Sequence, residues 1–217
     1  MSTPIPRTFL SLALVLSGLV LLGTHAVAEE KKAYFAGGCF WCVESDFESL
    51  AGVHEVVSGY TGGTTANPTY KAVTKGGTGH YEAVEISYDD GVIDYDRLLH
   101  HFFRSVDPTD AGGQFCDRGD SYRTAVFVSN PEERAAAEMA KEEAQRDLGR
   151  TIVTPILDAS RFYVAEDYHQ DYYKSKDLVL TRRGPKSKAN AYKFYRKACR
   201  RDDRVRQLWG DAAPFAS

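Results

Sequence analysis

The sequence predicts one compact α/β sandwich, in which helices pack against a β-sheet. Segments with the two-residue period of strands alternate along the 217 residues with segments that carry an apolar stripe at helical spacing, and this alternation is typical of α/β folds. No internal repeat, linker or nucleotide-binding glycine fingerprint interrupts the order. The 27 basic and 30 acidic residues nearly balance, so no basic stripe indicates a nucleic-acid-binding protein. We therefore expect a single domain without a nucleic-acid partner.

The first 28 residues have the features of a secretory signal peptide. Arg7 precedes an apolar run over residues 9–22, and an Ala-Val-Ala cleavage signal occupies residues 26–28, which is the order typical of such peptides. An uncleaved membrane anchor is the alternative, but the run is short for a membrane span. We expect cleavage after Ala28, export to the periplasm and no stable membrane insertion afterwards. The mature protein would be one monomeric domain over residues 29–217.

The first structural elements are a short strand and a helix that meet at a cysteine. Residues 33–36 form an apolar run that predicts a buried strand, and an apolar stripe at helical spacing begins at Phe40. Gly37 and Gly38 lie between them and make the turn, so Cys39 falls at or near the helix N-terminus. Unpaired backbone N–H groups and the helix dipole at that end favour a thiolate, which is the reactive form of cysteine.

The clearest strand covers residues 80–88 and directs a carboxyl group toward the core. A strand over residues 53–60 and a glycine-rich loop over residues 61–79 come before it, and loops of that length are usually functional. In the alternating pattern Glu82 shares a face with apolar residues such as Val84. A carboxyl group in such a row should be partly desolvated, which raises its pKa toward that of a proton donor. A strand-end glutamate that faces water is the alternative.

The second half of the chain continues the alternation. Asp94 is the predicted N-cap of a helix with an apolar stripe, and Asn130 with Pro131 starts a longer helix that Gly149 ends. The basic run over residues 182–188 predicts a solvated loop. The remaining predicted segments are a polar loop at 107–121, strands at 122–128, 152–157 and 162–164, an aromatic and polar loop at 166–172, a helix at 189–198 and a loosely packed tail at 199–217.

Four cysteines, all within the expected mature domain, point to redox chemistry. Disulfides persist in the oxidising compartments that exported proteins enter, so two structural disulfides are one interpretation. However, Cys39 and Cys42 are only three residues apart, and close pairs are more often redox or metal sites than structural links. Cys116 and Cys199 are single and far apart, which does not fit the paired spacing of a zinc site. We therefore expect no metal.

Several blocks of the sequence resemble the peptide methionine sulfoxide reductases of the A type. The resemblance begins with Gly37, Cys39, Phe40 and Trp41 and runs from about residue 33 to residue 172, which is most of the expected mature chain. The blocks occur in the same order as in the family, and their combination is highly specific for it. The further blocks are Gly59-Tyr60, Asn67-Pro68-Thr69-Tyr70, residues 78–84, Asp107-Pro108-Thr109, residues 116–124 and residues 165–170.

The resemblance implies a ferredoxin-like α/β sandwich with long functional loops. It also implies thiol-dependent reduction of the S epimer of methionine sulfoxide, free or within proteins. In that reaction Cys39 is the implied nucleophile, and Glu82 is the implied proton donor to the sulfoxide oxygen. The other implied site residues are Tyr70 and Tyr122, which would hydrogen-bond that oxygen, Asp117, which would help to organise the site, and Phe40 and Trp41, which would form an apolar pocket for the methyl group on sulfur.

The expected reaction uses cysteine chemistry alone and implies no metal or organic cofactor. A sulfoxide oxygen leaves only when it is protonated, and Cys39 is then left as a sulfenic acid, which a second thiol converts to a disulfide. An external dithiol reductant such as a thioredoxin-like protein would reset the enzyme by exchange. Cys42 stands where the family often has glycine, which leaves the resolving cysteine open among three candidates. Cys199 comes first, because a mobile tail can reach the site, followed by Cys116 and Cys42.

Two other functions are compatible with part of the sequence. A general thiol–disulfide oxidoreductase built on Cys39-Phe40-Trp41-Cys42 would exchange disulfides on any substrate and would not need Glu82. A disulfide-stapled binding module would have no free thiol at Cys39 and no turnover. The main hypothesis is an exported reductase that repairs oxidised proteins of the cell envelope.

Overall fold

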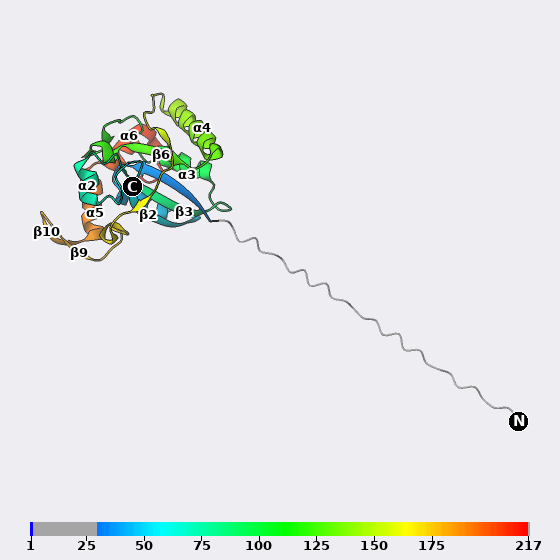
Figure 1. Cartoon of the computed structure of the whole chain (residues 1–217), viewed down its shortest axis with the longest axis horizontal. Coiled ribbons are helices and arrows are strands. Elements are labelled where there is room, and N and C mark those ends of the chain that lie inside the picture. The colour runs from blue at the N-terminus through cyan, green and yellow to red at the C-terminus, as the bar shows by residue number, and fades with distance from the viewer. Residues whose placement is uncertain (2–29, 217) are drawn as a thin grey trace.

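The structure, a computed structural model, describes Met1 and residues 30–216 (Figure 1). Apart from Met1, the predicted signal peptide therefore lies outside the described residues. None of the helices in residues 30–216 is long and apolar enough to cross a membrane.

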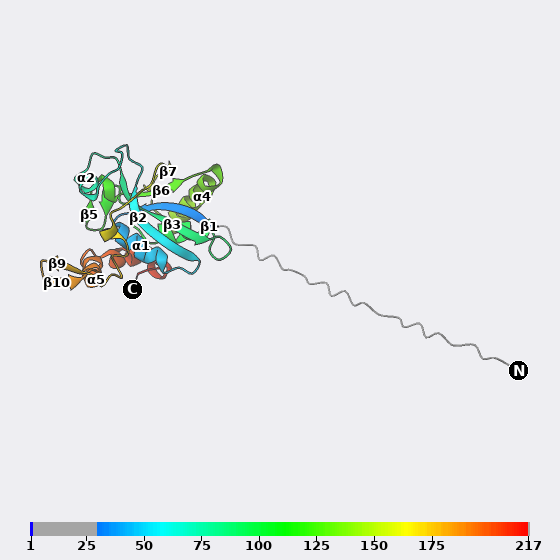
Figure 2. The ribbon, with the colours of Figure 1, turned by 60° about the horizontal axis from the view of Figure 1, so that its bottom comes forward.

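A six-stranded sheet forms the centre of the molecule (Figure 2). The strands lie in the order β7-β6-β1-β3-β2-β8, and all neighbours are antiparallel except β6 and β7. The sequence pattern predicted all six, although β6, β7 and β8 are shorter than expected. The strands are β1 (Glu30–Gly37), β2 (Val53–Thr61), β3 (Tyr81–Asp89), β6 (Thr124–Val128), β7 (Ile156–Asp158) and β8 (Tyr163–Val164).

Two interleaved β-α-β units give the sheet its topology. Helix α1 (Phe40–Glu48) connects β1 to β2, and helix α3 (Tyr95–Phe103) connects β3 to β6. Because β3 lies between β1 and β2, and β1 lies between β3 and β6, the two units are split and share their central strands. This arrangement is the ferredoxin-like order, so the predicted two-layer α/β sandwich is confirmed.

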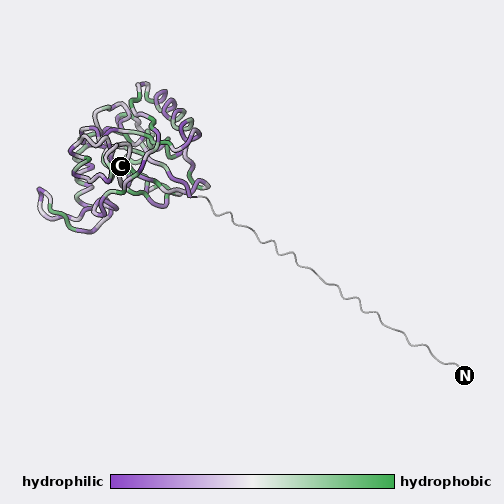
Figure 3. Tube along the Cα trace, in the orientation of Figure 1, coloured by the Kyte–Doolittle hydropathy of each residue, from purple (hydrophilic) through white to green (hydrophobic). Residues whose placement is uncertain are grey.

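The main core lies between the sheet and its helices. Phe35 on β1 packs against Phe47 of α1 and Phe102 of α3, with ring centroids 5.6 and 4.8 Å apart, and all three are fully buried. Helix α4 (Pro131–Leu148) covers the outside and is mainly hydrophilic (Figure 3). Its predicted ends are confirmed, since Asn130 accepts a hydrogen bond from the N–H of Glu133 at 2.8 Å and Gly149 adopts a left-handed backbone.

Short helices and strands lie within the segments that the sequence analysis predicted to be loops. The loop after β2 contains helix α2 (Tyr70–Lys75), which Thr69 caps through its side chain. The polar loop before β6 contains β4 (Gly113–Gln114) and β5 (Asp117–Arg118), which pair with each other, and the 3-10 helix η1 (Asp120–Tyr122). The aromatic loop contains the 3-10 helix η2 (Asp167–His169). Elements this short have too few residues for a periodic pattern.

Two expectations about the C-terminal segment are wrong. The basic run expected to be a loop belongs to a β-hairpin, β9 (Leu178–Thr181) and β10 (Gly184–Ser187), which extends from the body of the molecule (Figure 2). Helix α5 (Lys188–Ala198) follows it as predicted. The expected loose tail instead contains α6 (Arg201–Trp209) and a 3-10 turn, η3 (Gly210–Ala212).

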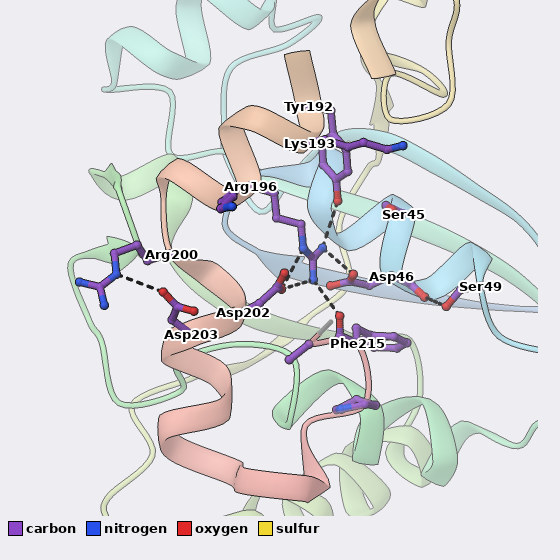
Figure 4. A pocket seen from close by; sticks show the side chains of 13 residues that line it. Ser45, Asp46, Ser49, Tyr192, Lys193, Arg196, Arg200, Asp202, Asp203 and Phe215 are labelled. Carbon is purple, nitrogen blue, oxygen red and sulfur yellow. Dashed lines mark hydrogen bonds and ion pairs between the residues drawn. The ribbon is translucent and has the colours of Figure 1, made fainter. Parts of the chain in front are cut away.

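Buried arginine contacts explain why this last segment is packed. Arg201 is 2% exposed and donates hydrogen bonds to the carbonyl oxygens of Gly37 at 3.1 Å and Ser105 at 3.0 Å. One turn earlier Arg196 pairs with Asp46 and Asp202, each at 2.6 Å (Figure 4). The mean hydropathy of the segment does not predict this packing, because several of its charged groups form internal hydrogen bonds and ion pairs instead of facing water.

We predict that Arg201→Met destabilises the protein by about 2–4 kcal/mol, because two buried carbonyl groups lose their donor. Unfolding in urea, followed by tryptophan fluorescence, measures the effect. Arg200→Met is the matched control: its side chain is 78% exposed, so its effect should stay within about 0.5 kcal/mol. Equal effects of the two substitutions would contradict the assignment.

Candidate active site

The turn between β1 and α1 places Cys39 at the start of a helix. Gly38 has a φ of +82°, and a Cβ there would lie 2.5 Å from Cβ of Gln114, so the turn requires glycine. Cys39 is the N-cap residue of α1, and its carbonyl accepts a hydrogen bond from the N–H of Cys42 at 3.0 Å. The strand-to-helix turn and the helix-terminal cysteine predicted from the sequence are both present.

Glu82 lies at the start of β3 and meets the same helix end. Its Oε2 accepts a hydrogen bond from the backbone N–H of Phe40 at 3.2 Å. The side chain is 2% exposed, and Oε1 has no hydrogen-bond partner within the described residues. Burial, aided by the negative charge of Asp117, raises the pKa of Glu82 to about 8. The carboxyl group is therefore protonated at neutral pH, as expected for a glutamate that shares a face with apolar residues.

One small cavity of about 60 Å³ brings most of the predicted site residues together. Cys39 and Glu82 lie on its wall, and Cys42 lies beside Cys39 without lining the cavity. Cys116 and Cys199 do not line it either. Its volume admits a group of only a few atoms. The residues around the cavity are Cys39, Phe40, Trp41, Tyr70, Glu82, Asp117, Tyr122 and Tyr195.

Aromatic rings form the apolar side of the cavity. Phe40 stacks on Tyr70 with ring centroids 6.2 Å apart, and Trp41 stacks on Tyr172 at 3.8 Å. The backbone N–H of Tyr70 donates to Glu166 at 2.9 Å, which fixes the start of α2. Such a wall suits a small apolar group rather than a charged one.

His169 completes the aromatic wall from behind. It is 2% exposed and packs 4.3 Å from Tyr70, 5.0 Å from Phe40 and 5.6 Å from Trp41, measured between ring centroids. Burial lowers its pKa to about 4. The ring is therefore neutral at physiological pH and acts as one more aromatic surface.

Tyr195 is a site residue that the sequence analysis did not find. It lies on α5, lines the cavity, and its hydroxyl donates a hydrogen bond to Oδ2 of Asp117. Burial raises the pKa of Asp117. No motif marks Tyr195; the only signal in the sequence is its position on an aromatic, basic helix close to Cys199.

The two thiols of α1 lie against each other and differ in acidity. Burial, the hydrogen bond with Cys42 and the nearby carboxyl groups of Glu82 and Asp117 raise the pKa of Cys39. The same hydrogen bond, together with the positive charge of Arg201, lowers the pKa of Cys42. The expectation of a lowered pKa at Cys39 is therefore wrong for the free protein, because burial outweighs the favourable helix N-terminus.

Cys116 and Cys199 are joined in a disulfide with their Cα atoms 5.0 Å apart. The bond links the loop that carries Asp117 to the turn between α5, which carries Tyr195, and α6. Phe115, next to Cys116, stacks against Arg201 with 4.8 Å between the guanidinium carbon and the ring centroid. Of the four cysteines, only Cys39 and Cys42 are free, and both are buried.

Elsewhere in the described part of the chain, three acidic side chains lie close enough together to share a cation. Glu44, Glu48 and Asp171 have carboxyl oxygens within 4.8 Å of one another. Lys174 already pairs with Glu48 at 2.7 Å and with Asp171 at 2.8 Å. Glu44 accepts hydrogen bonds from Ser58 and from the N–H of Asp171. These contacts account for the group as a structural cluster.

Comparison with known proteins agrees with the geometry. The family described as PMSR, peptide methionine sulfoxide reductase, matches residues 31–209. The peptide methionine sulfoxide reductase MsrA 2 of Caulobacter vibrioides is 48% identical over 204 residues, which cover 92% of this chain and 97% of that protein. MsrA 2 of Rhizobium meliloti is 46% identical over 193 residues, which cover 89% of this chain and 90% of that one.

Solved structures of similar proteins share the fold. Reduced Mxr1 from Saccharomyces cerevisiae superposes with a TM-score of 0.64 at 32% identity, over 67% of this chain and 85% of that one. Methionine sulfoxide reductase A of Corynebacterium diphtheriae gives a TM-score of 0.59 at 32% identity, over 66% of this chain and 73% of that one.

We predict that the carboxyl group of Glu82 loses its proton as the pH rises through about 8, because the anion is poorly solvated in the cavity. Infrared difference spectra would show the carbonyl stretch of the protonated acid disappear over this range. The band should be absent from Glu82→Gln. Glu44→Gln is the control and should remove a separate band, since burial raises the pKa of Glu44 to about 7. A Glu82 that is ionised at neutral pH would contradict the account.

Proposed function

The chain belongs to the peptide methionine sulfoxide reductase family, and we propose that the cavity at the start of α1 is where it reduces the S epimer of methionine sulfoxide to methionine. The enzyme is an oxidoreductase, a peptide-methionine (S)-S-oxide reductase. The observation that carries the assignment of the site is the contact of Glu82 with the N–H of Phe40, the residue after Cys39. It holds a protonated acid beside a buried thiol.

The substrate's two small groups on sulfur would enter different sides of the cavity. The methyl group packs on the aromatic wall of Phe40 and Trp41, where burial of apolar surface supplies binding energy. The oxygen faces Glu82 and the hydroxyl groups of Tyr70 and Tyr122, which line the same cavity. Only one arrangement of methyl, oxygen and side chain around the chiral sulfur satisfies both sides, which gives the site its preference for one epimer.

In the first half of the reaction Cys39 attacks the sulfur atom. Glu82 donates a proton to the sulfoxide oxygen, which makes the oxygen a leaving group. Once the sulfur of Cys39 has bonded to the substrate sulfur, the S–O bond of the substrate breaks and the oxygen passes as hydroxide to the sulfur of Cys39. The bond between the two sulfurs breaks with its electron pair on methionine, which leaves a sulfenic acid on Cys39, so no atom is gained or lost. Glu82 recovers its proton from the attacking thiol, whose high pKa keeps it protonated before the substrate arrives.

Cys42 then resolves the sulfenic acid. Its sulfur attacks that of Cys39, water leaves and a disulfide forms. Three observations support Cys42 over the other candidates: it contacts Cys39, its pKa is lowered, and Cys116 and Cys199 are already bonded to each other. Cys199, the candidate that the sequence placed first, would have to leave its disulfide and the packed turn between α5 and α6 to act.

A dithiol protein of the thioredoxin type then restores the enzyme. Its thiolate attacks one sulfur of the Cys39–Cys42 disulfide, and its second thiol completes the exchange. Thiols carry both electrons throughout, so the reaction requires no prosthetic group.

The enzyme is proposed to act outside the cytoplasm as a monomer. The N-terminal 28 residues have the features of a signal peptide, and the Cys116–Cys199 disulfide is compatible with an oxidising compartment. Its substrates there would be oxidised proteins of the envelope.

A general thiol–disulfide oxidoreductase is the alternative function. Such an enzyme would exchange disulfides without a proton donor or an apolar pocket, so Glu82 and the aromatic wall would have no role. Methionine sulfoxide therefore fits the cavity better than a protein disulfide does.

We predict that Glu82→Gln lowers kcat/KM for a methionine S-sulfoxide peptide by roughly 10²–10⁴-fold, which is the usual contribution of general acid catalysis. In the parent enzyme kcat/KM should fall as the pH rises above about 8, because Glu82 is then ionised. In Glu82→Gln this fall of kcat/KM at alkaline pH should be absent. If the fall persists in Glu82→Gln, Glu82 is not the group that causes it.

We predict that Cys42→Ser retains the first turnover but loses steady-state activity with a thioredoxin-type reductant. The sulfenic acid on Cys39 should accumulate and react with dimedone, which mass spectrometry detects. The control is Cys116→Ser combined with Cys199→Ser, which should still turn over, although removal of the disulfide lowers stability by about 2–4 kcal/mol. Turnover by Cys42→Ser with no turnover by the double variant would reverse the assignment.

A further inference from the structure

The basic run that the sequence presented as a solvated loop is part of a larger charged surface. Residues 174–201 hold eleven Lys and Arg side chains and a single acidic one, Asp177. The whole chain has more acidic than basic residues, so positive charge is concentrated in this segment and the remainder is acidic. The segment comprises the β9–β10 hairpin and α5.

Six of these cations have no ion pair with any described residue. Arg196, Arg200, Lys174 and Lys188 each pair with a carboxylate, and Arg201 is buried. The six that remain are exposed and form what we call the basic face: Lys176, Arg182, Arg183, Lys186, Lys193 and Lys197. In Figure 4 Lys193 extends away from the Arg196 network.

Apolar side chains are exposed within the basic face. Leu178 is 77%, Leu180 81% and Phe194 47% exposed. Leu180 pairs with Pro185 across the hairpin and Lys186 pairs with Val179. Cross-strand partners share a face and successive residues alternate, so one side of the ribbon is apolar and Lys186 lies on the other side. In Figure 3 the hairpin alternates between purple and green at the edge of the molecule. A two-stranded ribbon is marginally stable alone, and within the described residues β9 and β10 pair only with each other.

The basic face and the active-site cavity share helix α5. Tyr195 of α5 lines the cavity, whereas Lys193 and Lys197, two residues before and after it, lie on the other side of the helix and line the pocket around Asp46. At the base of the hairpin Lys188 lies 5.8 Å from the ring centroid of Tyr172, and that ring stacks on Trp41. A polypeptide whose oxidised methionine occupies the cavity would therefore have neighbouring residues near the base of the hairpin.

We propose that the β9–β10 hairpin and α5 form a docking surface for acidic, extended polypeptide segments that carry the oxidised methionine. The proposal rests on the proposed function and names the class of substrate. Carboxylates of the substrate pair with the basic face, its apolar residues cover Leu178 and Leu180, and its backbone can add to a free edge of the hairpin. Because these contacts lie away from the reacting sulfur, they improve binding and on-rate rather than the chemical step.

The test compares matched peptides in which the methionine S-sulfoxide is flanked on both sides by Glu or by Gln. We expect the Glu peptide to have a kcat/KM roughly five- to tenfold higher, mainly through KM, since each exposed charge pair changes an equilibrium constant by a factor of about two to five. The preference should fall as salt is added. Free methionine sulfoxide should show no such salt dependence.

Charge reversal at the basic face should abolish the preference. Arg182→Glu combined with Lys186→Glu should give the Glu peptide no advantage over the Gln peptide, while activity on free methionine sulfoxide stays unchanged. Arg146→Glu with Arg150→Glu is the control, because it makes the same change of charge at the end of α4, on the opposite side of the molecule from the hairpin (Figure 1). This control should retain the preference.

Three outcomes would overturn the docking proposal. Equal kcat/KM for the two peptides would do so, and so would a preference that survives Arg182→Glu with Lys186→Glu. Binding of the parent to anionic phosphatidylglycerol vesicles, lost in that variant and accompanied by no peptide preference, would assign the surface to a membrane instead. Absence of activity on free methionine sulfoxide in the parent would contradict the proposed function itself, so the two failures are distinguishable.

Discussion

The hydrogen bond from the N–H of Phe40 to Glu82 is the contact on which the site depends. It ties the first turn of α1 to the start of β3, two elements that adjoin only because β1 and β3 are neighbours in the sheet. A helix N-terminus normally stabilises an anion. Here burial opposes that effect, so the carboxyl group is protonated at neutral pH while it still accepts the N–H. The sheet thus supplies an acid and the helix a thiol, both in a cavity too small for much water.

The C-terminal segment completes the cavity from outside the sandwich. Tyr195 reaches Asp117 from α5, and Arg201 reaches the carbonyl of Gly37, two residues before Cys39. The Cys116–Cys199 disulfide joins the same loop and the same turn. One wall is therefore held in place by five residues remote from Cys39 in sequence: Cys116, Asp117, Tyr195, Cys199 and Arg201. The structure assigns these residues to positioning the site, whereas the proposed proton and electron transfers use the cysteines of α1 and Glu82 of β3.

The sequence predicted most of the sheet, the main helices and every residue that lines the cavity except Tyr195. The alternation of residues 80–88 placed Glu82 on the buried face, and the glycines before Cys39 located the turn, because both signals are local. The features that the sequence did not predict depend on contacts between distant segments. Burial of Cys39 and the pairing of Cys116 with Cys199 have no local signal. Segment 199–217 is rich in charged residues, so the burial of Arg201, Val205 and Trp209 was not predicted, and Tyr195 belongs to no motif that periodicity can detect.

A single-turnover reaction without external reductant tests the central claim most directly. Protein with free Cys39 and Cys42 thiols is mixed with each epimer of a methionine sulfoxide peptide, and methionine and disulfides are then determined by mass spectrometry. The account predicts about one methionine per chain, from the S epimer, because one thiol pair supplies two electrons. It also predicts a new Cys39–Cys42 disulfide beside an unchanged Cys116–Cys199 bond. Methionine formed from the R epimer, or formed while Cys39 and Cys42 stay reduced, would contradict it.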